Sequence, residues 1–335
     1  MDKKQLPFAT IVIPCRNEEK HIEKCLEALL RQDYPRDRLE IIVVDGISTD
    51  GTRRILEEFS RRDPRVRIFD NEKIFTPFAL NIGIRAAAGE IIVLMGAHAD
   101  YQSDFLSKCV HYLFEYGADN VGGRMVTLPR DNTLVGKAIV LALSHPFGAG
   151  NAEFRLVQKE PKWVDTVFGG CYRREVFDKI GFFNEKLTRG QDIEFNVRLK
   201  KAGGKILLAP DIVCSYYARS SMKDFFMHDF RGGSWVFYSR KFTNESLRLR
   251  HYLPAASFLA GVCLLAAGFY WPVSWMVLAV LAGFYILLSL FFSVKIAIKE
   301  RDLRYVFLML VTFGSRHAAY ALGSLNGIVK IILKK

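Results

Sequence analysis

Residues 94–101 (LMGAHADY) bring together side chains that could bind a cation. His98 and Asp100 stand two positions apart, directly after an apolar run. In an extended segment, positions i and i+2 point to the same side. An imidazole nitrogen beside a carboxylate oxygen tolerates Mn²⁺ better than two hard oxygen ligands would. The segment is therefore either part of a cation site or a solvated strand end.

The elements that must position these two side chains are short apolar runs. Runs rich in β-branched residues predict strands at 8–14, 41–45, 66–70 and 90–95, with helical patterns between them. Buried strands that alternate with helices predict an α/β fold, with a parallel sheet and helices on both faces. Such sheets bind ligands beyond the carboxyl ends of their strands. Three polar clusters, at 14–18, 45–46 and 96–100, are therefore expected along one edge.

The part of the chain that follows is less regular. VGGRMVTL and WVDTVFGGCYRREVF predict strands around a loop, and KILLAPDIVCSYY predicts a pair of strands. QDIEFNVRLKKAGG predicts a helix that ends at the glycine pair Gly203 and Gly204.

The C-terminal region is apolar enough to enter a membrane. Residues 252–294 contain no charged side chain. A bilayer span takes about 20 apolar residues, so this run predicts two spans, at about 253–271 and 272–294. A third apolar segment, at about 305–329, could span the membrane, re-enter it or lie at its surface. Its Arg316 and His317 could hold a phosphate group within the membrane region or reach the headgroups.

The charge balance favours a membrane over nucleic acid. The net charge is +12, and half of it lies in residues 254–335, beside the predicted spans. Such an excess is expected to meet anionic headgroups and phosphorylated ligands. Residues 135–147 are expected on the membrane surface or in the core. The six cysteines show no C-x-x-C spacing, which predicts reduced thiols in a cytosolic compartment.

Several motifs in order resemble family-2 inverting glycosyltransferases with a GT-A fold. They are TIVIPCRNEE, IIVVDGISTDGT, ALNIGIRAAAGEIIVL, FGGCYRREVFDKIGFFNE and GQDIEFNVRLKKAGGKI. SHPFGAGNAEFR and A-H-A resemble the membrane-anchored branch that includes the succinoglycan-biosynthesis glucosyltransferase. The resemblance covers roughly residues 8–240. It implies a Rossmann-like, mostly parallel GT-A domain with interfacial segments at 1–245, followed by a helical transmembrane region at 246–335.

The resemblance also implies a donor site. Asp45 would accept a hydrogen bond from a uracil N–H, and its alternative role is to cap the loop 46–51. The other residues that the resemblance assigns to substrate binding near the donor are Pro14, Arg16, Asn17, Glu18 and Asn81.

The family's D-x-D motif is altered here. Gly96 and His98 stand where the two acids usually stand, and Asp100 occupies a position that binds the metal in some relatives. The resemblance implies that His98 and Asp100 hold Mn²⁺ or Mg²⁺, which would neutralise charge on the leaving nucleoside diphosphate. The alternative is a metal-free site in which Arg or Lys meets that charge.

The remaining assignments concern the acceptor side. Asp192 would be the general base that takes the acceptor's hydroxyl proton, with Glu194 as runner-up. Alternatively, Asp192 is a helix N-terminal charge, and Gln191 replaces the family's usual Glu. The assigned acceptor and phosphate contacts are Gly169, Gly170, Arg231 and Trp235. Arg231 could instead contact lipid headgroups.

The resemblance implies transfer of a hexose from a nucleoside-diphosphate sugar, with UDP expected, to a lipid-linked glycan acceptor in surface polysaccharide or glycan assembly. A polyprenyl-phosphate sugar synthase and a non-catalytic GT-A binding module are the alternatives, the latter because Gly96 and Gln191 lack the expected acids. The expected location is the cell membrane, with the catalytic domain cytoplasmic and no nucleic-acid partner.

Overall fold

The computed structural model describes residues 6–150, 152–243 and 249–333. The chain divides into two compact units. The first joins Met1–Val126 to Ala152–Tyr217, and the second joins Thr127–Asn151 to Ala218–Lys335. The functional division near residue 245 stays a prediction.

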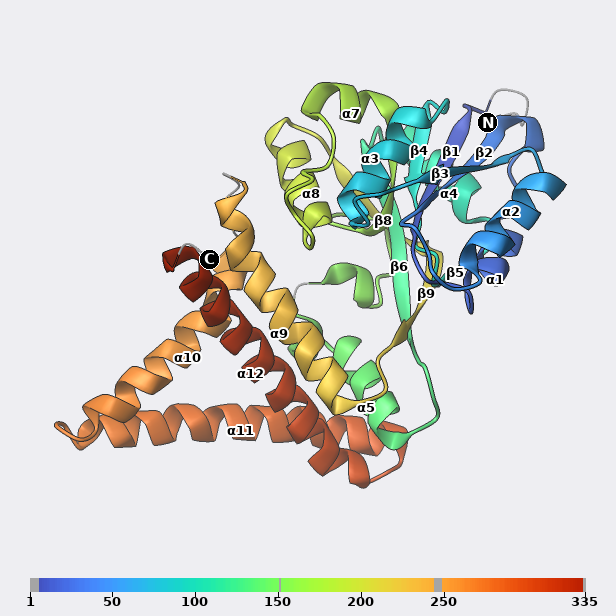
Figure 1. The fold of residues 1–335 in the computed structure, drawn as a ribbon. Coiled ribbons are helices and arrows are strands. Elements are labelled where there is room, and N and C mark those ends of the chain that lie inside the picture. The colour runs from blue at the N-terminus through green and yellow to red at the C-terminus, as the bar shows by residue number, and fades with distance from the viewer. Residues whose placement is uncertain (1–5, 151, 244–248, 334–335) are drawn as a thin grey trace. The chain divides into compact units, whose positions relative to one another are not determined.

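A parallel half-sheet forms the start of the first unit (Figure 1). Its strands run in the order β3-β2-β1-β4, and each neighbouring pair is parallel. The strands are β1 (Ala9–Cys15), β2 (Leu39–Asp45), β3 (Val66–Asp70) and β4 (Ile91–Leu94). The helices between them are α1 (Ile22–Leu30), α2 (Thr52–Arg62) and α3 (Thr76–Ala86). The expected strand–helix alternation is confirmed.

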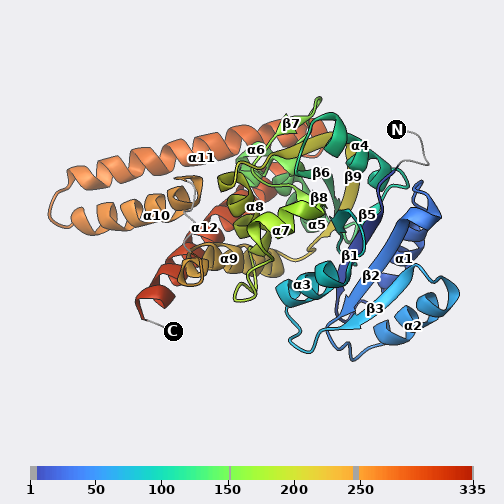
Figure 2. The ribbon, with the colours of Figure 1, turned by 90° about the horizontal axis from the view of Figure 1, so that it is seen from above.

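Helices cover both faces of this half-sheet. Ile11 and Ile13 of β1 pack into one apolar cluster with α1, α2 and α4 (Phe105–Glu115). Val12, which points the other way, packs into a second cluster with α3. Figure 2 shows α2 and α3 on opposite sides of the strands. Burial on both faces explains why these strands read as continuous apolar runs.

The second half of the sheet is antiparallel where the pairing is assigned. Strand β8 pairs with β4 and β6, and β9 pairs with β5 and β7. These strands are β5 (Ala99–Tyr101), β6 (Asn120–Pro129), β7 (Lys162–Trp163), β8 (Phe168–Arg173) and β9 (Ile206–Ala218). The helices here are α7 (Arg174–Ile180) and α8 (Gln191–Lys201). The α/β class is confirmed, and the complete sheet is mixed.

Strand β9 is one strand of 13 residues, where the sequence predicted a pair. Residues Leu207–Leu208 pair with β7, and Cys214–Tyr216 pair with β5. Pro210 lies between the two pairings, so its missing N–H interrupts neither ladder. The proline therefore marks a change of partner instead of a turn.

The second unit is helical. Its helices are α5 (Leu134–Leu143), α6 (Pro146–Ala149), α9 (Met222–Tyr238), α10 (Leu249–Ala267), α11 (Val273–Glu300) and α12 (Arg304–Ile332). Helix α12 runs along α9 (Figure 1). A Cβ on Gly233, Gly323 or Gly327 would collide with a carbonyl oxygen of the partner helix. These glycines let the two backbones approach closely, as small residues do in membrane helix pairs.

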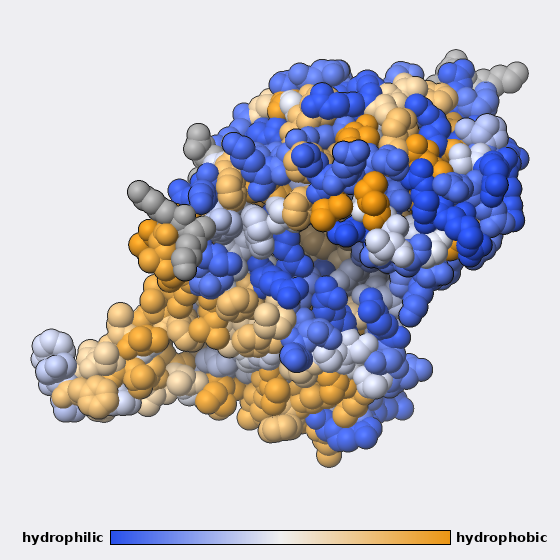
Figure 3. Space-filling model, viewed as in Figure 1, coloured by the Kyte–Doolittle hydropathy of each residue, from blue (hydrophilic) through white to orange (hydrophobic). Residues whose placement is uncertain are grey.

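Among the residues that the structure describes, one helix, α11, is long and apolar enough to cross a membrane. Figure 3 shows apolar surface along the arm that α10 and α11 form. Helix α10 is the shorter of the two, and its apolar segment is His251–Ala267. The third predicted segment forms the single helix α12, so it contains no re-entrant turn. Ala138 and Ala142 of α5 pack in one buried cluster with α12, which favours the core alternative for residues 135–147.

Candidate active site

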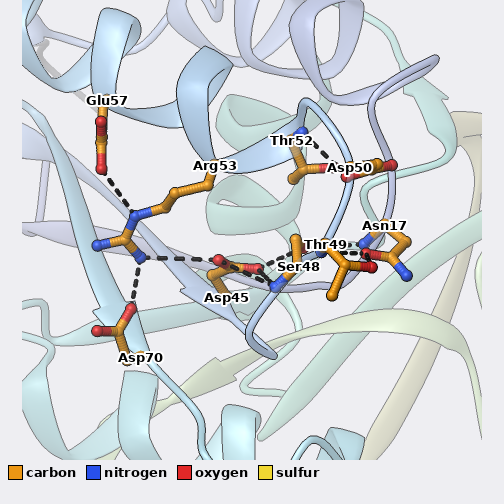
Figure 4. A network of polar contacts seen from close by, with 9 residues as sticks. All are labelled: Asn17, Asp45, Ser48, Thr49, Asp50, Thr52, Arg53, Glu57 and Asp70. Carbon is orange, nitrogen blue, oxygen red and sulfur yellow. Dashed lines mark hydrogen bonds and ion pairs between the residues drawn. The ribbon is translucent and has the colours of Figure 1, made fainter.

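The loops that follow β1 and β2 are bound to each other (Figure 4). The backbone N–H of Asn17 donates to Ser48 Oγ (2.9 Å), and the N–H of Thr49 donates to Asn17 Oδ1 (2.8 Å). The N–H of Glu18 donates to Thr52 Oγ1 (2.8 Å). Asn17 has a φ of 53°, a left-handed conformation that Asn tolerates better than most residues. The predicted convergence of the first two polar clusters is therefore present.

Asp45 stands at the end of β2 and is buried. Its Oδ1 accepts the hydroxyl (2.5 Å) and the backbone N–H (3.2 Å) of Ser48. Its Oδ2 lies 3.7 Å from Arg53 Nη1, and Arg53 also pairs with Asp70 and Glu57 (Figure 4). The carboxylate thus caps its own loop, as the alternative role expected. Its uracil contact stays a prediction.

Arg53 was not found from the sequence. Its only local signal was the spacing to Glu57, one helical turn away, which is common on exposed helix faces. The structure adds that it connects Asp45 to Asp70 across the ends of two adjacent strands. Arg16, from the predicted donor set, lies over the same loop, because a Cβ on Gly46 would sit 3.3 Å from Arg16 Cβ.

His98 lies in the turn before β5 and Asp100 lies within β5, and the two side chains have different partners. His98 Nδ1 is 3.1 Å from Glu18 Oε1. Asp100 Oδ2 accepts from Lys24 Nζ (2.9 Å) and from Tyr217 Oη (3.0 Å). The hydrogen bond to Asp100 raises the pKa of Lys24. Glu18, assigned to the base and ribose, thus lies beside His98.

The donor set fits a divalent cation only in part. Glu18 and His98 supply one oxygen and one nitrogen at close range. The Asp100 carboxylate is already paired with the ammonium group of Lys24. Over the residues that the structure describes, no group of three or more His, Cys, Asp or Glu side chains could hold a metal. Cations of this class often complete their coordination with substrate phosphates and water. An imidazole–carboxylate pair is compatible with that mode of binding.

Gly96 lies where the family's first acid would stand, and there is space for a side chain. A Cβ at this position would meet only Tyr101 Oη, at 3.9 Å. The N–H of Gly96 donates to the same hydroxyl (2.7 Å). The local backbone would therefore accept an aspartate at position 96, so the fold does not require a glycine there.

Arg155 is a second cation that the sequence analysis did not assign. It belongs to the quoted motif SHPFGAGNAEFR, which carried its only signal. Its guanidinium lies 5.5 Å from the ring centroid of Tyr216, and the same ring contacts His98 edge-on at 6.4 Å. Arg155 is thus near the predicted diphosphate position.

The two candidate bases at the start of α8, Asp192 and Glu194, have different surroundings. Glu194 is buried and receives a bidentate ion pair from Arg198, at 2.8 and 3.0 Å. Arg198 also donates to the carbonyl of Phe182 (2.7 Å). Glu194 is therefore committed to structure. Asp192 is exposed at the surface, yet desolvation by the surrounding protein raises its pKa above the ordinary value.

Two of the assigned glycines have conformations that favour glycine. Gly169 has a φ of 72° and Gly170 a φ of 124°. A Cβ on Gly170 would lie 2.8 Å from the hydroxyl of Tyr172. The loop that should admit the acceptor therefore depends on the absence of side chains here.

Asn81 and Pro14 occupy structural positions. The buried Asn81 amide donates to the carbonyl of Phe183 and to Glu185 (both 2.9 Å), and accepts from the N–H of Phe183 (3.0 Å). Its amide is thereby committed to this loop, and its substrate contact stays a prediction. Pro14 lies within β1, opposite Val44 of β2.

The remaining candidates belong to the helical unit. Arg231 is exposed on α9, and Trp235, one turn later, packs edge-on against Tyr238 at 5.3 Å. Arg316 forms a 3.0 Å ion pair with Asp229 and donates to the carbonyl of Gly148. Their roles in phosphate binding stay predictions.

His317 is similarly engaged. Its Nε2 lies 2.9 Å from the carbonyl oxygen of Phe147, and its Nδ1 lies 2.8 Å from Tyr285 Oη. Together, His317 and Arg316 hold the short helix α6 through its backbone carbonyls. These contacts of both side chains are thus internal to the unit.

Comparisons with known proteins identify the family of this chain. Residues 10–181 match the model "Glycosyl transferase family 2". The chain is 30% identical over 332 residues to a dolichyl N-acetyl-alpha-D-glucosaminyl phosphate 3-beta-D-2,3-diacetamido-2,3-dideoxy-beta-D-glucuronosyltransferase of Methanococcus voltae, covering 96% of this chain and 98% of the relative. It is 31% identical over 225 residues to succinoglycan biosynthesis protein ExoA of Rhizobium meliloti, covering 67% of each.

A solved structure confirms the fold. The mannosyltransferase PcManGT from Pyrobaculum calidifontis, in complex with GDP-Man and Mn²⁺, superposes with a TM-score of 0.63 at 22% identity. The match covers 98% of this chain and 88% of that one. The GT-A expectation is thereby confirmed.

Proposed function

This chain belongs to glycosyl transferase family 2, and we propose that it is an inverting enzyme that moves a hexose from a nucleoside-diphosphate sugar to a lipid-linked glycan. The observation that carries the proposal is the match to the Methanococcus voltae relative, which extends over 96% of this chain and therefore includes the C-terminal helices. The name of that relative describes transfer to a dolichyl-phosphate-linked sugar.

Asp192 is the proposed general base. Inversion in one step needs a carboxylate that takes the acceptor's hydroxyl proton. The acceptor oxygen then bonds to the anomeric carbon as the bond from that carbon to the diphosphate oxygen breaks. The proposal is supported by the ion pair that commits Glu194 to Arg198. The raised pKa of Asp192 makes it a stronger base than an ordinary Asp.

The donor would bind along the edge formed by the loops after β1, β2 and β4. In this proposal Asp45 accepts a hydrogen bond from the nucleobase. Arg155 and the His98–Glu18 pair lie toward the diphosphate. A divalent cation bound by His98, with Glu18 or Asp100, would supply charge neutralisation on the leaving group. UDP as the nucleotide and Mn²⁺ or Mg²⁺ as the cation are parts of the proposal.

The lipid-linked acceptor requires a membrane location. Helix α11 is long and apolar enough to cross a bilayer. We infer a location in the cell membrane with the catalytic unit in the cytoplasm, where nucleotide sugars are made. The shorter helix α10 would complete a hairpin with α11.

The test is a transfer assay with the full chain in membranes. The donors are radiolabelled UDP-glucose, UDP-N-acetylglucosamine and GDP-mannose. The acceptors are undecaprenyl phosphate, dolichyl phosphate and the same lipids already carrying N-acetylglucosamine. Label on a sugar-primed lipid that Asp192→Asn abolishes is the expected result. Label on the unprimed lipid phosphate would instead identify a polyprenyl-phosphate sugar synthase.

A non-catalytic module is a second candidate, and a specific observation favours it. Gly96 and Gln191 stand where the family has acids, and the backbone at Gly96 would accept a side chain. Under this alternative, no donor would give transfer although a nucleotide still binds. Thermal stabilisation by UDP or GDP without turnover would therefore favour a binding role.

A further inference from the structure

A buried polar network lies beneath the start of α8. The amide of Asn196 donates to Thr166 Oγ1 (3.0 Å). Its carbonyl oxygen accepts from Asn120 Nδ2 (3.2 Å) and from Tyr172 Oη (3.4 Å). Asn120 is fully buried, and Asn196 and Tyr172 are each 1% exposed. One side chain of α8 is thus hydrogen-bonded to β6, to β8 and to the loop before β8.

This network is costly for a core that needs only packing. The neighbours of Asn196 on α8, Phe195 and Leu199, are buried apolar residues. A buried amide loses its hydrogen bonds to water and must replace them with hydrogen bonds inside the protein. The replacement here is incomplete, because Asn120 Oδ1 is buried without a partner in the structure. Apolar residues at both positions 120 and 196 would avoid this cost.

The network connects the two features assigned to the acceptor side. Asn196 lies one helical turn after Asp192, so both side chains project from the same face of α8. The charge of Asp192 contributes to raising the pKa of Tyr172, after the larger effect of burial. The hydroxyl of Tyr172 in turn lies under Gly170.

We propose that Asn196 is a positioning residue, which fixes the rotation and depth of α8 so that the carboxylate of Asp192 meets the acceptor hydroxyl beside Gly169 and Gly170. This inference rests on the proposed role of Asp192 as the base. Hydrogen bonds of defined direction fix the rotation of a helix more narrowly than apolar packing does. A displacement of about 1 Å at a reacting group can cost about 10²-fold in rate.

The test uses matched variants of the full chain. Asn196→Leu keeps the volume and removes the network. Thr166→Val removes only the hydroxyl that accepts from Asn196, whereas Thr166→Ser keeps it. Lys200→Met is the control, because it breaks the 2.7 Å pair of α8 with Asp165, outside the network. If Asn196→Leu fails to fold, the comparison of Thr166→Val with Thr166→Ser still tests the proposal.

Two readouts separate positioning from stability. With the donor and lipid that give transfer, Asn196→Leu and Thr166→Val should lower kcat at least tenfold and leave the donor KM within twofold. Without any substrate, carbodiimide labelling of Asp192 followed against pH by mass spectrometry should shift its midpoint by at least half a pH unit in the same two variants. Thr166→Ser and Lys200→Met should resemble the wild type in both readouts.

The outcomes distinguish this inference from the proposed function. If Asp192→Asn keeps full transfer activity, the assignment of the base fails, and the positioning role fails with it. If Asp192→Asn is inactive while Thr166→Val keeps the wild-type kcat and labelling midpoint, the inference about Asn196 fails alone. Equal loss of kcat in Thr166→Ser and Lys200→Met would also overturn it, because any weakening of α8 would then suffice.

Discussion

The carboxylate of Glu18 and the imidazole of His98, 80 residues apart in the sequence, meet at 3.1 Å at the edge of the sheet. If this pair binds the cation of a nucleoside diphosphate complex, UDP with Mn²⁺ should stabilise the protein more than UDP with a chelator. A ligand at 100 times its Kd stabilises by about 2.7 kcal/mol. We expect His98→Ala to remove the Mn²⁺-dependent part of this shift, measured by thermal unfolding in detergent.

Lys24→Met provides the control for this prediction. It leaves the Glu18–His98 pair intact and removes the exposed ammonium from Asp100. Mn²⁺-dependent stabilisation should persist or increase in this variant, because Asp100 becomes available. An unchanged Mn²⁺ effect in His98→Ala would place any cation elsewhere.

Gly96→Asp should restore an acid of the family motif without harming the fold. A Cβ at position 96 would have only one neighbour, Tyr101 Oη at 3.9 Å. A third donor near His98 should lower the Mn²⁺ concentration for half-maximal stabilisation at least several-fold, because a further charged ligand strengthens cation binding. Gly89→Asp is the contrasting case, since a Cβ there would lie 2.6 Å from the backbone N of Thr10 and should destabilise the protein. A Gly96→Asp variant with unaltered Mn²⁺ dependence would contradict the assignment.

Arg155 should contribute to the affinity for the diphosphate and not for the base. Its guanidinium lies on the Tyr216 ring that also contacts His98. Arg155→Met should weaken UDP binding by about tenfold, which corresponds to about 1.4 kcal/mol, and should change uridine binding little. Arg155→Lys should recover only part of the affinity, because lysine lacks the planar fork. Equal weakening for UDP and uridine would indicate a general loss of structure.

Removing the charge of Glu194 should destabilise the protein, whereas removing the charge of Asp192 should not. Breaking the buried pair with Arg198 by Glu194→Ala should cost roughly 3 kcal/mol of unfolding free energy. The pKa of Asp192 is raised in the folded state, so its contribution to stability is complete below the ordinary Asp pKa and is lost as the pH rises through the folded value. Asp192→Asn should therefore be at least as stable as the wild type at pH 7.

The measurements for this pair are unfolding midpoints between pH 4 and pH 8, with transfer activity alongside. Asp192→Asn should gain stability relative to the wild type as the pH rises, while its activity is lost at all pH values. Wild-type activity should rise with pH through the folded pKa of Asp192, because the base acts deprotonated. A stability difference that shrinks with rising pH would contradict a raised pKa at Asp192.

The sequence was most informative where one periodicity dominated. Ile11, Val12 and Ile13 read as a buried strand because both faces of β1 are covered, and the parallel half-sheet follows from that pattern. Strand β9 was harder, because Pro210 suggests a turn unless the change of partner strand is known. That information is a pairing between segments far apart in the chain, which local propensity does not contain.

Side-chain partners were less predictable than positions. The spacing of His98 and Asp100 could not show that Lys24 pairs with Asp100 or that the carboxylate of Glu18 contacts His98. Arg53 and Asn196 were missed because an arginine or asparagine on a helix is ordinary in sequence. Their significance depends on which buried groups surround them, and therefore on the tertiary structure.

Helix α11 should cross the membrane with its ends on opposite sides. From Trp275 to Lys295 the rise of an α-helix gives about 30 Å, the thickness of a hydrocarbon core. Aromatic residues including Trp271 gather at one end and lysines at the other, as interfacial anchors and the positive-inside rule require. A cysteine at Tyr270 should therefore react with a membrane-impermeant maleimide in intact cells, and a cysteine at Arg301 only after permeabilisation.

The native cysteines should interfere little with this labelling experiment. Among the native cysteines only Cys263 is exposed, so Cys263→Ser leaves five buried thiols that should not react. A helical hairpin of α10 and α11 requires α10 to cross as well, and its apolar segment His251–Ala267 rises about 25 Å, so the turn before α11 would have to complete the span. Reaction of both new cysteines from the same side would show that α11 lies along the membrane, and the apolar surface of Figure 3 would then be an interfacial face.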